Sequence, residues 1–169
     1  MAVTLDELLD SSQPGLGDPL LSDKWRIISL PTMRGVSLSP LACEEVDLPF
    51  PIYQASSKQI ATVDVHFPKG TSISGFSLMF GLDQTAAVIK YADAWANSIQ
   101  NPNTGGFYLP GAYKKNIEVA LFNTKGKKVM TAIIRNCWPL GLSNLSLNGT
   151  GTRLMPSLQF QCDTQRLKF

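Results

Sequence analysis

Apolar and polar residues alternate with a period of two along much of the chain, a pattern typical of β-strands with one buried face. The clearest case is residues 113–142, where Ile117 and Val119 alternate with polar or small neighbours. Residues 123–126 (Asn-Thr-Lys-Gly) predict a turn, because Asn and Gly tolerate left-handed backbone geometry. The returning residues 128–137 are apolar on both faces, which favours a central position in a sheet. This stretch therefore predicts a long β-hairpin.

The hairpin ends in a Trp-Pro pair. Pro139 has no backbone N–H to donate to a ladder, so the strand is expected to end at Trp138. A large aromatic residue where the chain leaves the sheet is well placed to plug the end of a core. Trp138 and Pro139 are therefore predicted to be structural core residues.

The remaining pattern predicts more strands and one substantial helix. The further strands fall at 24–30, 41–48, 61–67, 71–80 and 157–167. Lys69 and Gly70 predict the turn between the strands at 61–67 and 71–80. A helix is predicted over 84–100, with Asp83 as its N-cap and Trp95 in the core. Its apolar stripe at helical spacing is Val88, Tyr91, Ala92, Trp95 and Ile99.

These elements fit a single domain over residues 1–169. Thr4-Leu-Asp-Glu7 is a capping box that predicts a short helix at 5–10, inside an N-terminal arm at 1–23. Residues 49–70 form an extended excursion that is longer than a connection between two strands needs. The predicted fold class is mainly β (α+β): an antiparallel β-sandwich or barrel with one flanking α-helix and an N-terminal arm.

Composition adds little chemistry but hints at assembly. Only 17% of residues are charged, and a surface short of charge is suited to contacts with other subunits. The net charge of +2 is too small to imply nucleic-acid binding by itself. Cys43, Cys137 and Cys162 are odd in number and lack CxxC spacing, so they are expected to be free, buried thiols in a reducing cytoplasm. The N-terminus shows no signal-peptide pattern, and no apolar run reaches membrane-spanning length.

No motif predicts catalysis, a cofactor or a metal site. His66 is the single histidine and lies in an alternating strand, where a solvent-facing structural role is the simpler interpretation. A small hydrolase that depends on His66 remains an open alternative. A nucleic-acid-binding β-barrel is another, because five lysines around the hairpin form either a basic patch or a solvated hairpin end. These lysines are Lys114, Lys115, Lys125, Lys127 and Lys128.

The order of short motifs carries a resemblance. Residues 43–49 (CEEVDLP) precede a long extended excursion, and 90–95 (KYADAW) lie in the predicted helix. Residues 113–115 (YKK) open the hairpin and 137–139 (CWP) close it, before a final alternating strand. In this order and over nearly the whole chain, the sequence resembles the tail tube proteins of contractile-tailed bacteriophages.

The resemblance implies a structural role without cofactor or catalysis. It implies a homo-hexameric ring whose subunits join their inner sheets into one barrel, and rings that stack into the channel through which DNA is ejected. It implies a sheath protein outside, a tape measure protein and DNA in the lumen, a baseplate and a tail terminator at the ends, and no membrane. The location implied is the virion tail tube, assembled in the host cytoplasm. A baseplate tube-initiator and a type VI secretion-like tube protein are the alternatives within this resemblance.

Two sets of residues follow as candidates for these contacts. A channel for DNA needs a neutral or acidic wall, because Lys and Arg would hold the passing duplex. The polar strand faces that lack Lys and Arg supply the candidate channel-lining residues Glu45, Asp47, Thr62, Asp64, Gln159, Gln161, Asp163 and Gln165. By resemblance, the excursion reaches the next ring. Its candidate inter-ring contacts are Phe50, Ile52, Tyr53, Gln54 and Lys58.

Overall fold

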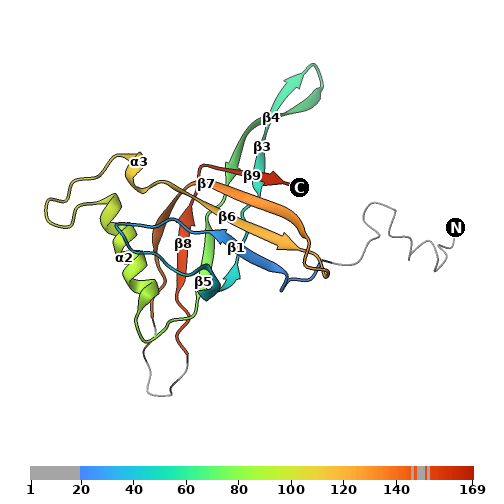
Figure 1. Cartoon of the computed structure of the whole chain (residues 1–169). Coiled ribbons are helices and arrows are strands. Elements are labelled where there is room, and N and C mark those ends of the chain that lie inside the picture. Colours follow the sequence, from blue (N-terminus) through green and yellow to red (C-terminus); the bar gives the residue numbers. More distant parts are fainter. Residues whose placement is uncertain (1–19, 146, 148–150, 152) are drawn as a thin grey trace.

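The computed structural model of the chain describes residues 20–145, 147, 151 and 153–169. The helix predicted at 5–10 lies outside these residues. The described part is mainly β, with antiparallel sheets and one main helix, as predicted. Seven strands form one sheet in the order β1-β6-β7-β8-β5-β2, with β9 also paired to β7, and β3 and β4 form a separate ribbon (Figure 1). The strands are β1 Trp25–Ser29, β2 Cys43–Val46, β3 Pro51–Ile60, β4 Val63–Ile73, β5 Phe76–Phe80, β6 Lys115–Phe122, β7 Lys128–Leu142, β8 Ser157–Gln161 and β9 Thr164–Lys168. The helices are a 3₁₀ turn Pro40–Ala42, α2 Ala87–Ile99 and α3 Pro110–Tyr113.

The strand β7 joins the two halves of the sheet. Up to Arg135 it pairs with β6 on one side and β9 on the other, and from Trp138 onward it pairs with β8. The change of partner occurs at Asn136, which has a positive φ of 54° and whose N–H donates to Asn116 Oδ1 at 3.1 Å. Asn takes this left-handed geometry at low cost. The sheet can therefore fold over on itself at this point and enclose a core.

The prediction that this strand ends at Trp138 is wrong. β7 runs on through Pro139 to Leu142. Beyond Cys137 it pairs with β8 alone, and a register shift lies between Pro139 and Gly141. A proline is tolerated where one side of a strand is unpaired or where a bulge interrupts the ladder, so the missing N–H does not end the strand.

The core lies between the two halves of the sheet and α2. Trp95 is fully buried, with its ring 5.2 Å from Phe160 and 5.6 Å from Tyr91. Its indole N–H donates to Tyr113 O at 2.8 Å, and the Tyr91 hydroxyl donates to Pro31 O at 2.7 Å. Buried aromatic residues need such partners for their polar atoms. Burial also raises the pKa of Tyr91.

The helix α2 begins three residues later than predicted. Its N-cap position is Ala86, which has a positive φ of 53°, and not Asp83. Asp83 caps from outside the helix, because its Oδ1 accepts the N–H of Ala87 at 3.0 Å and its Oδ2 accepts the Thr85 hydroxyl at 2.6 Å. These hydrogen bonds, that from Thr85 first, lower the pKa of Asp83. The predicted stripe is buried at Val88, Tyr91 and Trp95, whereas Ala92 and Ile99 are half buried.

The predicted last strand, 157–167, is two strands. The chain bends at Cys162 and Asp163, so β8 lies in one half of the sheet and β9 in the other. The bend is held by Lys114, whose Nζ donates to both Asp163 carboxylate oxygens at 2.8 and 2.9 Å. The backbone N–H of Asp163 donates to Arg135 O at 3.2 Å. Lys114 lies 49 residues away in sequence, so no local pattern signals this break.

Removing the Asp163 carboxylate is expected to cost less than about 1 kcal/mol of unfolding free energy at pH 7, because the pair is part-exposed. The Lys114 hydrogen bonds lower the pKa of Asp163 below its usual 3.8. This stabilisation is present above the unfolded-state pKa and is lost as the pH falls through the lower folded-state pKa. Urea unfolding of wild type and Asp163→Asn at neutral and acidic pH checks it. The assignment is contradicted if the difference in unfolding free energy between the two proteins grows in acid. Asp64→Asn, which removes an exposed carboxylate, is the control.

All three cysteines are free and buried, as predicted. Burial raises the pKa of the Cys43 and Cys137 thiols to about 12 and that of Cys162 to about 11. These thiols stay protonated at neutral pH and are poor nucleophiles. Cysteines introduced at the surface are therefore expected to react in preference to the native ones. A test of assembly by cysteine cross-linking depends on this difference.

Candidate assembly surfaces

The ribbon of β3 and β4 projects from the body as an arm, residues 51–73 (Figure 1). In the described part of the chain its strands pair only with each other, and nearly every residue is exposed. The turn predicted at Lys69 and Gly70 is wrong. The register pairs Ile60 with Val63, so the chain reverses at Ala61 and Thr62. Gln54 pairs with Gly70 and Ala55 with Pro68, which leaves Lys69 as the extra residue of a β-bulge.

The arm has one apolar face and one polar face. Paired residues of an antiparallel ribbon share a face, and faces alternate along each strand. From the tip inward, the apolar face carries Ile60, Val63, Lys58, Val65, Ser56 and Phe67. The polar face carries Gln59, Asp64, Ser57 and His66. Ile60, Val63 and Phe67 are 53%, 62% and 47% exposed and Val65 is half buried, so within the described residues most of the apolar face is open.

The candidate inter-ring contact residues lie on the arm or directly beside it. Ile52, Tyr53, Gln54 and Lys58 lie on β3, and Phe50 immediately precedes it. All five are exposed, Tyr53 by 70%. The period-two pattern of this stretch is real, but its apolar residues face outward and have no core beneath them. His66 is exposed on the polar face of the arm, in agreement with the solvent-facing interpretation.

The half of the sheet made of β1, β6, β7 and β9 has two free edges. Among the described residues, β1 pairs only with β6, and β9 pairs only with β7. Free edges present unpaired N–H and C=O groups that can pair with another chain. β2 is likewise paired on one side only, with β5.

The side of this half-sheet that faces away from the core is basic. Ile27, Val119 and Ile134 point into the core, so their neighbours along each strand point outward. We call this outward side the basic face; its charged residues are Arg26, Glu118, Arg135, Arg166 and Lys168. The four cations are exposed, and none takes part in the three ion pairs of the described residues.

The candidate channel-lining residues do not form one surface. Glu45, Asp47, Gln159 and Gln161 lie on the outer side of the β2-β5-β8 sheet, where Asp47 accepts the Ser77 hydroxyl at 2.9 Å. Thr62 and Asp64 are at the tip of the arm, and Asp163 is at the bend before β9. Gln165 pairs with the buried Ile134 and so points away from the basic face. Sequence alternation placed side chains on strand faces but did not show which strands share a sheet.

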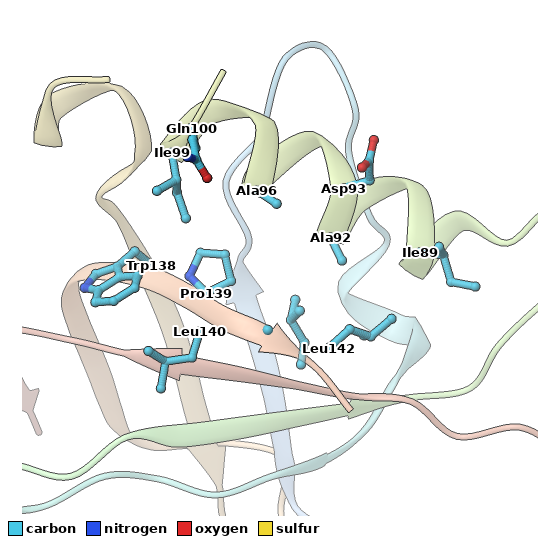
Figure 2. Close-up of a pocket in the computed structure, with 12 residues that line it drawn as sticks. Ile89, Ala92, Asp93, Ala96, Ile99, Gln100, Trp138, Pro139, Leu140 and Leu142 are labelled. Atoms are coloured by element: carbon cyan, nitrogen blue, oxygen red, sulfur yellow. The ribbon is translucent and has the colours of Figure 1, made fainter. Parts of the chain in front are cut away.

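A groove of about 440 Å³ runs between α2 and the second half of β7 (Figure 2). Ile89, Ala92, Ala96 and Ile99 line its helical wall, and residues 138–142 its floor. Trp138 does not plug the core as predicted. It pairs with Gln161, lines the groove beside α2, is half buried, and meets Tyr113 edge-on at 6.5 Å. Pro139, paired with Phe160, is buried.

The described residues offer no group of three or more His, Cys, Asp and Glu side chains that would hold a metal ion. In the same part of the chain, no helix is both long and apolar enough to span a membrane.

The fold resembles that of chains from contractile injection system and anti-feeding prophage assemblies, in agreement with the resemblance found in the sequence. A chain from the cryo-EM structure of an extracellular contractile injection system, the PVC sheath/tube terminator in the extended state, aligns with a TM-score of 0.67 and 16% identity over 90% of this chain and 98% of that one. A chain from the anti-feeding prophage baseplate aligns with a TM-score of 0.67 and 11% identity over 90% and 97%. A chain from the PVC sheath-tube complex aligns with a TM-score of 0.60 and 14% identity over 99% of both chains. No protein-family model matches the chain, and no curated protein matches its sequence. These similar chains come from sheath, tube, terminator and baseplate assemblies.

Proposed function

We propose that the protein is a structural subunit of the tube of a contractile tail or injection system, which forms hexameric rings that stack. The observation that carries the proposal is the match of nearly the whole chain to nearly the whole of chains from sheath, tube and baseplate assemblies. Within the described residues, the free strand edges and the exposed arm offer surfaces for assembly. The sheath would surround the tube, and the baseplate and terminator would close its ends.

The geometry supports a ring. The free edges of β1 and β9 lie on opposite sides of one half-sheet, so β1 of one copy can pair with β9 of the next. Repeated around a closed ring, this pairing joins the half-sheets into one barrel and removes both exposed edges. The core side of each half-sheet is covered by its own subunit, so the basic face would line the lumen. Glu45 and Asp47 would then lie away from it.

The apolar face of the arm supports stacking. An amphipathic ribbon of this length with exposed Ile60, Val63 and Phe67 is an aggregation hazard unless another chain covers it. A neighbouring ring is the partner that a tube supplies. In a phage, the lumen of the stacked rings would hold the tape measure protein and pass DNA.

A ring at the end of a tube is the second candidate. The chains from the PVC terminator, the anti-feeding prophage baseplate and its tube-terminating cap each align with a TM-score of 0.67, against 0.60 for the chain from the sheath-tube complex. A terminal ring would use the same edges but stack on one side only. It would form rings that do not extend into tubes.

Paired cysteines test the ring contact. β1 and β9 of one copy are separated by β6 and β7, so Ile28→Cys cannot reach a cysteine on β9 of its own copy. Combined in turn with Thr164→Cys, Arg166→Cys or Lys168→Cys, it is expected to give a ladder of disulfide-linked oligomers on mild oxidation. Non-reducing gel electrophoresis measures this, and the single-cysteine variants are the controls. Rings that assemble with no cross-link in any combination would contradict the β1–β9 contact.

A further inference from the structure

The basic face combines charge with an apolar floor. One row across the sheet runs Arg26, Ala120, Thr131, Lys168, with the cations at its two ends. The next row places Glu118 and Arg166 on either side of Ile133. Thr131 and Ile133 are 8% exposed, whereas Ile28 and Val129 on the same face are 47% and 41% exposed. The surface therefore offers cations around aliphatic side chains.

Residues 1–19 have the complementary chemistry. They carry four of the chain's thirteen acidic residues and no Lys or Arg, so the rest of the chain holds nine acidic against fifteen basic side chains. Their first ten residues interleave acids with leucines, in the order Leu5, Asp6, Glu7, Leu8, Leu9, Asp10. The carboxylates of such a peptide can pair with the cations, and its leucines can cover the exposed Ile28 and Val129.

The segment is also attached beside this surface. It leads through residues 20–24 into β1, the edge strand that carries Arg26. Nineteen residues reach at most about 60–70 Å when extended, whereas the four strands of the half-sheet are about 15 Å across. The whole face is within reach of its own N-terminus.

We propose that residues 1–19 dock on the basic face of their own copy, with the carboxylates of Asp6, Glu7 and Asp10 on its cations and the leucines on its aliphatic floor. This goes beyond the proposed function, because it describes a single copy and holds whether or not rings form. A nucleic-acid duplex is the other anion to consider. It offers phosphates to the cations but nothing to the exposed aliphatic side chains, and Glu118 would repel it. In the docked state the cations are neutralised, and the face no longer holds passing polyanions by counterion release.

The full-length protein tests this by cleavage at Glu7 with a glutamate-specific protease. A docked segment is expected to be cut slowly. The triple variant Arg26→Gln, Arg166→Gln, Lys168→Gln is expected to be cut at least about tenfold faster, because it loses its charge-assisted contacts. Added salt is expected to speed cleavage of the wild type and not of this variant. The matched control Lys69→Gln, Lys125→Gln, Lys127→Gln removes three exposed cations elsewhere and is expected to be cut like the wild type.

A charge swap separates docking from loss of folding. Asp6→Lys with Asp10→Lys is expected to free the segment, and adding Arg26→Glu with Arg166→Glu is expected to restore protection. Thermal unfolding by circular dichroism verifies that each variant is folded. Equal cleavage of the triple variant and its control would overturn the proposal, as would failure of the swap in a folded protein. A short DNA duplex that binds the full-length wild type, but not the triple variant, would show that the face is open and would also overturn it.

Discussion

A chain in which residues 52–72 are replaced by a two-residue Asn-Gly turn is expected to fold like the wild type but to form no tubes. The arm supplies no buried residue to the core, because every position of β3 is exposed and β4 is exposed apart from its half-buried Val65 and Ile73. Pro51 and Ile73 are paired neighbours at the base of the arm, so a short turn can join them. The free energy of unfolding is expected to change by about 1 kcal/mol or less. Assembly is lost because the apolar face is lost.

Two adjacent residues give a matched pair for the same idea. Phe67 lies on the apolar face of the arm and His66 on the polar face. Phe67→Asp is expected to prevent stacking, whereas His66→Asp is expected to leave it intact. Electron microscopy and sedimentation measure assembly, and circular dichroism verifies folding. Full-length tubes from the shortened chain would contradict a role for the arm in stacking.

The largest loss of stability is expected from a substitution in the core. Trp95→Ala is expected to lower the free energy of unfolding by about 3–5 kcal/mol, the usual range for a buried aromatic. The indole is fully buried, contacts Tyr91 and Phe160, and donates to Tyr113 O. Its removal leaves a cavity and an unpaired carbonyl.

Trp138→Ala is the control for this prediction. Trp138 is half buried in the groove beside α2, so its loss is expected to cost about 1–2 kcal/mol, in proportion to the area it buries. Urea unfolding monitored by far-UV circular dichroism measures both variants. A larger loss for Trp138→Ala than for Trp95→Ala would mean that the core is assigned to the wrong tryptophan.

Much of the fold is predictable from local patterns. The hairpin of β6 and β7 has its turn where Asn123 and Gly126 predict it, and Asn123 Oδ1 accepts the N–H groups of Lys125 and Lys127. The helical stripe correctly places Val88 and Trp95 in the core. These elements succeed because their signals are local: a turn residue, or a spacing on one face.

The predictions that the structure contradicts concern features that local sequence patterns do not determine. The arm reverses at Ala61 and Thr62, which carry no turn signature, whereas Gly70 marks a bulge and not a turn. Alternation shows that one face of the arm is apolar but not what covers that face. Pro139 continues a strand because its neighbour on one side is absent, and that depends on the whole sheet.

The candidate site was less predictable for the same reason. The split of residues 157–167 at Asp163 depends on Lys114, so Gln159 and Gln165 fall in different halves of the sheet. The basic face combines Arg26 with residues near the C-terminus, which are adjacent only through β6 and β7. A face assembled from four strands has no sequence signal before the strand order is known.

The central claim is that copies of this chain close into rings. Negative-stain electron microscopy of the purified protein, alone at high concentration and with a baseplate seed, tests it most directly. The account predicts six-fold rings, either free or stacked into tubes, in class averages. A protein that stays monomeric under every condition, including seeding, would contradict it.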